Sequence, residues 1–243
     1  MAGVGGRKKR GYSRDVSAER LRDYRLFAIG CEGGKREPDY FEVFEHLSSR
    51  IKVDIIGKVN NLDGKIVEPE TKSSPEWVLE RVKNYMSEHN LDEEDQIWFV
   101  LDIDRWSPNS LKAIEQICRD IPNLNVVFSD PCFEVWLYLH QKQNFIGIEN
   151  VSCSDLKEKV GALYKGGYCS LLFIQDVEQA CKNAKAIDNS DSTRPNKNET
   201  KVYQLVEALL AFAPVKDKEN FFEKKLPEFI QIKKETLQKK KKT

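Results

Sequence analysis

The chain has 243 residues, of which 40% are hydrophobic, enough for a single core of α/β size. Its 39 basic and 39 acidic residues cancel, so net charge predicts neither a nucleic-acid nor a membrane partner. No apolar run approaches the roughly 20 residues that cross a bilayer, and the first residues lack the apolar stretch of a signal peptide, so we expect a cytoplasmic protein with no membrane partner. The six cysteines form no C-x-x-C pair, which favours reduced, structural thiols over a zinc ribbon or a disulfide framework.

Residues 1–23 combine arginine, lysine and glycine without an apolar period, which predicts a basic N-terminal arm. Beyond them, short apolar runs alternate four times with helical patterns. The predicted strands are RLFAIGC, KVDIIGKV, QIWFVLDID and NVVFSD, and the predicted helices are PDYFEVFEHLSSR, SSPEWVLERVKNYMSEHN, SPNSLKAIEQICRDI and PCFEVWLYLHQ. In the second helix we expect one buried stripe, made of Trp77, Val78, Val82 and Tyr85. Residues 213–243 are expected to form a helical, basic tail.

This alternation is typical of an α/β fold, in which a mainly parallel sheet is covered by helices on both faces. In open sheets of this kind the ligand binds beyond the carboxyl ends of the strands. Polar residues that follow the strands are therefore the first candidates for a site. They are Glu32, Lys35, Arg36 and Glu37 after the first strand, Asp102, Asp104 and Arg105 after the third, and Asp130 and Glu134 after the fourth.

Asp102 and Asp104 lie two residues apart at the end of a strand, so both side chains point to the same side. Two carboxylates this close repel each other unless a cation lies between them, and Mg²⁺ or Mn²⁺ suits oxygen ligands. A solvated turn explains this pair alone equally well. Glu32 ends another predicted strand and precedes two glycines, and this combination favours a metal site.

The segments GCEGGKREPDYF, FVLDIDRW and SDPCFEVWLYLH resemble successive motifs of the RloB-like proteins, a branch of the Toprim fold related in plan to the nuclease domain of the OLD family. The resemblance covers residues 24–212, with a weaker last block at NETKVYQLVEALL. It implies a Toprim-like domain over these residues and an acidic metal site in which Glu32, Asp102 and Asp104 match the signature and Glu37 adds a second acid of the first motif. It also implies a role in bacterial phage defence and abortive infection, often beside an ATPase partner.

We therefore predict a metal-dependent nuclease that hydrolyses phosphodiester bonds in RNA or DNA, with transfer RNA among the candidate substrates. A divalent ion stabilises the charge of the transition state and activates water, and the sequence leaves open whether one ion or two are bound. Asp102 and Asp104 would be the primary ligands. Glu32 would be a ligand or the general base, and Glu37 would support the first ion or bind a second.

Cationic side chains would complement the acids by binding substrate phosphates. The nearest in sequence are Lys35, Arg36 and Arg105, and more distant candidates are Lys182 and Lys185. Glu134 either joins the site or complements the dipole of its helix, and Asp130 adds another charge nearby. The three histidines show no ligand spacing and are expected to be structural.

Two other functions are compatible with the sequence. The first is a catalytically silent Toprim domain that acts as a binding or regulatory subunit of a defence ATPase, although the presence of Glu32, Asp102 and Asp104 argues against it. The second is a metal enzyme that acts on a nucleotide or small cofactor. RNA is not separated from DNA, and a homo-oligomer stays open.

Overall fold

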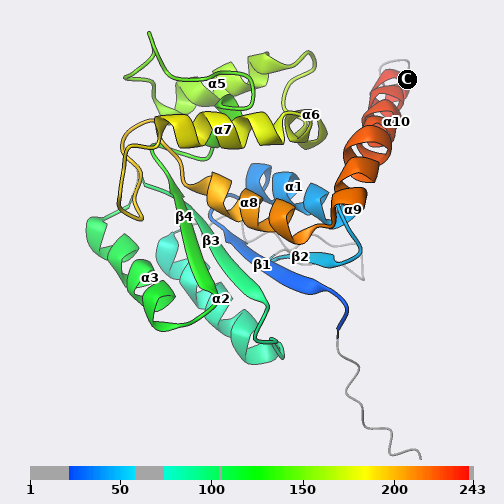
Figure 1. Cartoon of the computed structure of the whole chain (residues 1–243). Helices are drawn as coiled ribbons and strands as arrows, with labels where there is room; N and C mark the ends of the chain where they lie inside the picture. The colour runs from blue at the N-terminus through cyan, green and yellow to red at the C-terminus, as the bar shows by residue number, and fades with distance from the viewer. Residues whose placement is uncertain (1–21, 58–73, 104–105, 241–243) are drawn as a thin grey trace, which may run out of the picture.

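The computed structural model describes residues 22–57, 74–103 and 106–240 of the chain. Within them, four strands form one sheet: β1 (Arg25–Cys31), β2 (Ile51–Ile55), β3 (Gln96–Asp102) and β4 (Leu124–Ser129). Every neighbouring pair is parallel, which confirms the predicted α/β class (Figure 1). Most of the predicted basic arm, residues 1–21, lies outside the described residues.

The strand order is β2-β1-β3-β4. Strand β2 therefore lies on one side of β1, at an edge of the sheet. The chain then crosses back, and β3 and β4 are added on the other side of β1. The order reverses between β1 and β3, which pair directly from Phe27 with Gln96 to Cys31 with Val100. In open parallel sheets such a reversal leaves a crevice at the carboxyl ends of the two strands, where ligands bind.

One face of the sheet is covered by α2 (Pro75–Glu88) and α3 (Pro108–Asp120) (Figure 1). Helix α2 packs closely on β1 because Gly30 has no side chain, and an added Cβ there would lie 2.9 Å from Val82. Val82 is buried as expected, together with Val78 and Tyr85. The expectation for Trp77 is wrong, because its side chain is 38% exposed. Adjacent helical residues point about 100° apart, so Trp77 leaves the stripe that contains Val78.

The other face carries the larger core, which runs from β1 to the C-terminal helices. Its centre is aromatic, with Tyr40, Phe41, Phe44 and Trp136 all fully buried. The covering elements are α1 (Arg36–Phe41), η1 (Glu42–His46), α4 (Glu134–Tyr138), α5 (Cys153–Leu163), α6 (Ser170–Ile174), α7 (Val177–Ile187), α8 (Val202–Phe212), η2 (Phe221–Lys225) and α10 (Leu226–Lys240). Helix α9 (Val215–Asn220), between α8 and η2, has no buried residue.

The C-terminal region is helical, as expected, but its first part belongs to the core. Phe221 and Leu226 are buried against it, and His46 of η1 contacts the ring of Phe229 in α10 at a centroid distance of 4.9 Å. Figure 1 shows α10 continuing away from the sheet toward the C-terminus. No helix in the described part of the chain combines the length and apolarity that a membrane span requires.

The expectation that the cysteines are reduced is wrong for one pair, because Cys132 and Cys153 form a disulfide. The two residues are 21 positions apart, one in the loop after β4 and the other at the start of α5. Cysteine spacing carried no signal for this bond, since the fold alone brings the two segments together. Cys31, Cys118, Cys169 and Cys181 are free thiols.

Candidate functional site

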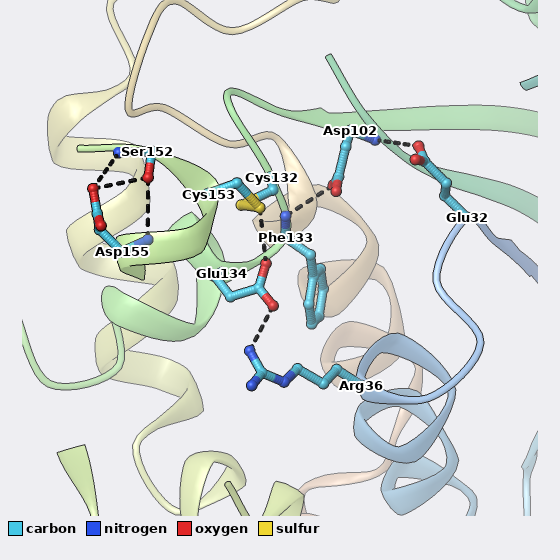
Figure 2. Close-up of a disulfide and its surroundings, with 9 residues drawn as sticks. All are labelled: Glu32, Arg36, Asp102, Cys132, Phe133, Glu134, Ser152, Cys153 and Asp155. Atoms are coloured by element: carbon cyan, nitrogen blue, oxygen red, sulfur yellow. Dashed lines mark hydrogen bonds and ion pairs between the residues drawn. A yellow bond between two sulfur atoms is a disulfide. The ribbon is translucent and has the colours of Figure 1, made fainter. Parts of the chain in front are cut away.

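Glu32 and Asp102 lie together at the point where the strand order reverses. Glu32 directly follows β1 and is buried, while Asp102 is the last residue of β3. The Oε2 atom of Glu32 accepts a hydrogen bond from the backbone N–H of Asp102 at 3.1 Å, and a second from Nε1 of Trp106 at 2.9 Å (Figure 2). The structure therefore brings together two of the acids that the sequence predicts for the site.

Asp102 is oriented by the loop that follows β4. Its Oδ1 atom accepts a hydrogen bond from the backbone N–H of Phe133 at 2.8 Å (Figure 2). Hydrogen bonds of this kind fix the direction of a carboxylate before any ligand binds, as second-shell partners do in metal sites. The two remaining candidates of this segment, Asp104 and Arg105, lie outside the described residues.

Glu37 lies in the first turn of α1 and is also buried. Its carboxylate folds back against Gly33, where an added Cβ would lie 2.5 Å from Cδ of Glu37. Burial raises the pKa of Glu37 to about 7, its own backbone N–H opposes the shift, and the charges of Glu134 and Glu32 add to it. The surroundings of Glu37 thus disfavour its ionised form, and a bound cation would offset the repulsion between the carboxylates.

Glu134 begins α4, and its carboxylate is held by an ion pair. The Oε1 atom of Glu134 accepts from Nη1 of Arg36 at 2.6 Å, with Glu134 4% exposed. Arg36 is in turn held by Tyr168, whose hydroxyl donates to the Arg36 carbonyl at 2.8 Å. Arg36, which was predicted to bind a substrate phosphate, is therefore already paired with the carboxylate of Glu134.

The other cationic candidates are spread over the surface. Lys35 precedes α1 and is exposed, as is Lys182 on α7. Lys185 donates to both carboxylate oxygens of Glu207 in α8, at 2.8 and 3.0 Å. It is therefore paired with an acid other than those predicted for the site. Sequence reasoning missed Arg81, which reaches from α2 to the carbonyl of Cys31, the residue before Glu32, at 3.0 Å.

Asp130 lies where the end of β4 meets a distant segment, residues 198–201. Its backbone N–H donates to the carbonyl of Glu199 at 3.0 Å, and its carbonyl accepts from the N–H of Asn198 at 2.8 Å. Ser129 forms an isolated antiparallel bridge with Thr200 in the same segment. The start of the NETKVYQLVEALL block, in which no site residue was predicted, is thus fixed beside the carboxyl end of β4 and the candidate Asp130.

Trp106 is the clearest site residue that sequence reasoning missed. It binds Glu32 through its indole N–H, although it is separated from Glu32 by 74 positions. Its place two residues after Asp104 was the available signal, but an aromatic residue beside a buried strand suggests packing first. His140 has the structural role expected of it, whereas His46 and His89 are exposed. His140 is buried, its Nδ1 faces the carbonyl of Trp136 at 3.0 Å, and burial lowers its pKa to about 3.

The acidic residues fit a hard divalent cation. Carboxylate oxygens are the ligands that Mg²⁺ and Mn²⁺ prefer, and Mg²⁺ commonly uses only one or two of them beside water and substrate phosphates. No three carboxylates in the described part of the chain lie within 4.8 Å of one another, so an ion held by Glu32 and Asp102 would take its other ligands from water, from a substrate or from Asp104.

Fold and site together define a class: an open parallel α/β protein with buried acids gathered where the strand order reverses. A family model described as RloB-like protein matches residues 27–209. The chain therefore belongs to the RloB-like family, in agreement with the resemblance of its motifs. No curated protein and no solved structure matches the chain.

Proposed function

We propose that the protein is a metal-dependent nuclease that hydrolyses phosphodiester bonds of RNA or DNA. The observation that carries the proposal is the pair of acids, Glu32 and Asp102, at the carboxyl ends of β1 and β3. Their orientation by N–H donors from Asp102, Trp106 and Phe133 favours a preformed site. A purely structural role would not require two carboxylates in the crevice where this fold binds ligands.

In this proposal Glu32 and Asp102 hold a Mg²⁺ or Mn²⁺ ion, with Asp104 as a further ligand. A divalent cation in this position stabilises charge on the phosphoryl oxygens and makes water a better nucleophile. Glu37 is suited to support the ion, because burial and the nearby charges of Glu134 and Glu32 disfavour its ionised form until a cation is bound. Lys35 and Arg81 are the cations that we assign to substrate phosphates.

The biological role that we propose is the one that the resemblance to RloB-like proteins implies. We propose a cytoplasmic effector of bacterial phage defence that works with an ATPase partner, since this is the setting that the RloB-like resemblance implies. The acids and cations that we assign to the site would bind the phosphodiester group, which RNA and DNA share, so the proposal covers both.

The test is cleavage of labelled single-stranded, duplex and transfer-RNA substrates with Mg²⁺, Mn²⁺ or EDTA. Asp102→Asn removes the charge but keeps an oxygen for the Phe133 N–H, so the variant should fold and lose at least about 100-fold in rate. Asp120→Asn, an exposed acid at the end of α3, is the matched control and should cleave normally. An ATPase partner is added in parallel.

Cleavage that disappears with EDTA and in Asp102→Asn, but not in Asp120→Asn, supports the nuclease. Silence of the wild type on every substrate, with no divalent-ion binding by calorimetry, contradicts it. In that case association with the ATPase without cleavage would identify a regulatory subunit, and turnover of a soluble nucleotide would identify a small-molecule enzyme.

A further inference from the structure

A second cluster of metal-binding side chains lies beside the acidic site. It consists of Cys132, Glu134 and Cys153, and in the described residues it is the one set of three acidic, cysteine or histidine side chains whose ligand atoms all lie within 4.8 Å of one another. Cys132 and Glu134 are buried, and Cys153 is 9% exposed. The Oε2 atom of Glu134 lies 3.8 Å from Sγ of Cys153 (Figure 2). The proposed nuclease reaction uses neither sulfur atom.

The carboxylate of this cluster is already oriented toward the sulfur atoms. Arg36 binds the Oε1 atom of Glu134 and leaves Oε2 on the side of Cys153. Outer-shell partners that hold one oxygen of a ligand in this way are common in metal sites. Ligand atoms in a tetrahedral zinc site are about 3.5 Å apart, because Zn–S bonds are about 2.3 Å and Zn–O bonds about 2.0 to 2.2 Å long. The spacing of Glu134 and Cys153 is close to this value.

Ligand chemistry separates this cluster from the acidic site. Two thiolates select soft or borderline cations, of which Zn²⁺ is the common one, whereas an all-carboxylate set suits Mg²⁺ and Mn²⁺. Three protein ligands with an open fourth position are typical of zinc sites that retain a water or an exchangeable ligand. The disulfide form offers no thiolate, so the disulfide and a zinc complex exclude each other.

We propose that Cys132, Cys153 and Glu134 bind one Zn²⁺ ion when the disulfide is reduced. Reduction by a dithiol transfers two electrons and two protons: the S–S bond of Cys132 and Cys153 breaks, two thiols form, and the reductant becomes a disulfide. Binding of Zn²⁺ then releases the two thiol protons as the two Zn–S bonds form.

The cluster is connected to the acidic site through one residue. Phe133 lies between Cys132 and Glu134 in sequence, and its backbone N–H is the donor to Asp102. A change between disulfide and zinc complex alters the distance between the two sulfur atoms and therefore the loop that carries this donor. Zinc binding itself does not rest on the proposed nuclease activity.

The test is competition for Zn²⁺ between a chromophoric chelator and the full chain, kept reduced with a phosphine. The reduced wild type should bind one Zn²⁺ per chain, and Cys132→Ser and Cys153→Ser should bind at least about 100-fold more weakly. Glu134→Gln should weaken binding about 10-fold. Cys118→Ser, which removes a free thiol on α3, is the matched control and should bind normally. The oxidised wild type should not bind tightly.

Cobalt substitution keeps the proposal testable if a cysteine variant fails to fold. The reduced wild type with Co²⁺ should show a thiolate-to-cobalt charge-transfer band, and the oxidised form should lack it. The proposal is overturned if that band is absent, if the reduced wild type binds Zn²⁺ no more tightly than a folded Cys153→Ser variant, or if Cys118→Ser loses binding to the same extent. None of these measurements depends on cleavage, so they separate failure of the zinc site from failure of the nuclease.

Discussion

Replacing Gly33 with alanine displaces Glu37 without adding any other large change. A Cβ at Gly33 would lie 2.5 Å from Cδ of Glu37, whereas ordinary contact begins at 3.4 Å, so the carboxylate must retreat by about 1 Å. Misplacement of a catalytic group by this amount costs about 100-fold in rate, and we expect that loss for Gly33→Ala. The overlapping atoms belong to the end of a flexible side chain, so the free energy of unfolding should change by less than about 1 kcal/mol.

The neighbouring Gly34 provides a matched control. An added Cβ there meets no atom within 4 Å, and neither glycine has a positive φ, so both accept alanine without backbone strain. The assay compares single-turnover cleavage and Mn²⁺ binding in the two variants, with thermal unfolding as a check on the fold. If the Gly33→Ala variant cleaves at a rate within about twofold of the Gly34→Ala rate, the role assigned to Glu37 is refuted.

Three further predictions concern side chains around the site. Trp106→Phe removes the indole N–H that orients Glu32 and should slow cleavage about 10-fold, whereas Trp77→Phe should not. His140 has a pKa of about 3 in the folded protein against 6.5 when unfolded, so the unfolded chain takes up the proton first. The free energy of unfolding should therefore fall as the pH drops below 6.5, by roughly 2 kcal/mol at pH 5 in denaturant titrations, and His140→Gln should lack this component. Arg36→Ala should lower the free energy of unfolding by roughly 3 kcal/mol, measured by thermal unfolding, because the buried carboxylate of Glu134 loses its ion pair. A loss below about 1 kcal/mol would contradict the ion pair between Arg36 and Glu134.

The parallel sheet was predictable because β1, β3 and β4 are buried on both faces. Phe99 and Leu101 point to one core while Trp98 and Val100 point to the other, so the whole run is apolar and stands out from the flanking turns. The full order of the strands was not predictable from these patterns. Only β2 differs, with an exposed Lys52, whereas β1, β3 and β4 are alike in composition. The reversal between β1 and β3 is known only from the pairing, and it is the pairing that explains why Glu32 lies beside Asp102.

Contacts between distant segments account for what sequence reasoning missed at the site. Arg36 was expected at a phosphate because cations complement acids, but nothing in its neighbourhood predicts Glu134, 98 positions away, as its partner. The bond from Trp106 to Glu32 and the disulfide have the same origin. Strand ends indicate which residues can meet, whereas the loops between them decide which side chains bind one another.

The two faces of the sheet are completed at different times during protein synthesis. Helices α2 and α3 lie between the strands in sequence, so the core on their side can form once β4 has left the ribosome. The opposite face needs helices α5 to η2, which are translated later. Until α8 emerges, for example, Phe27 lacks the ring of Phe212, whose centroid lies 6.3 Å from its own in the folded chain. The nascent chain therefore presents an apolar surface late in translation, the kind of surface to which chaperones bind and at which aggregation begins.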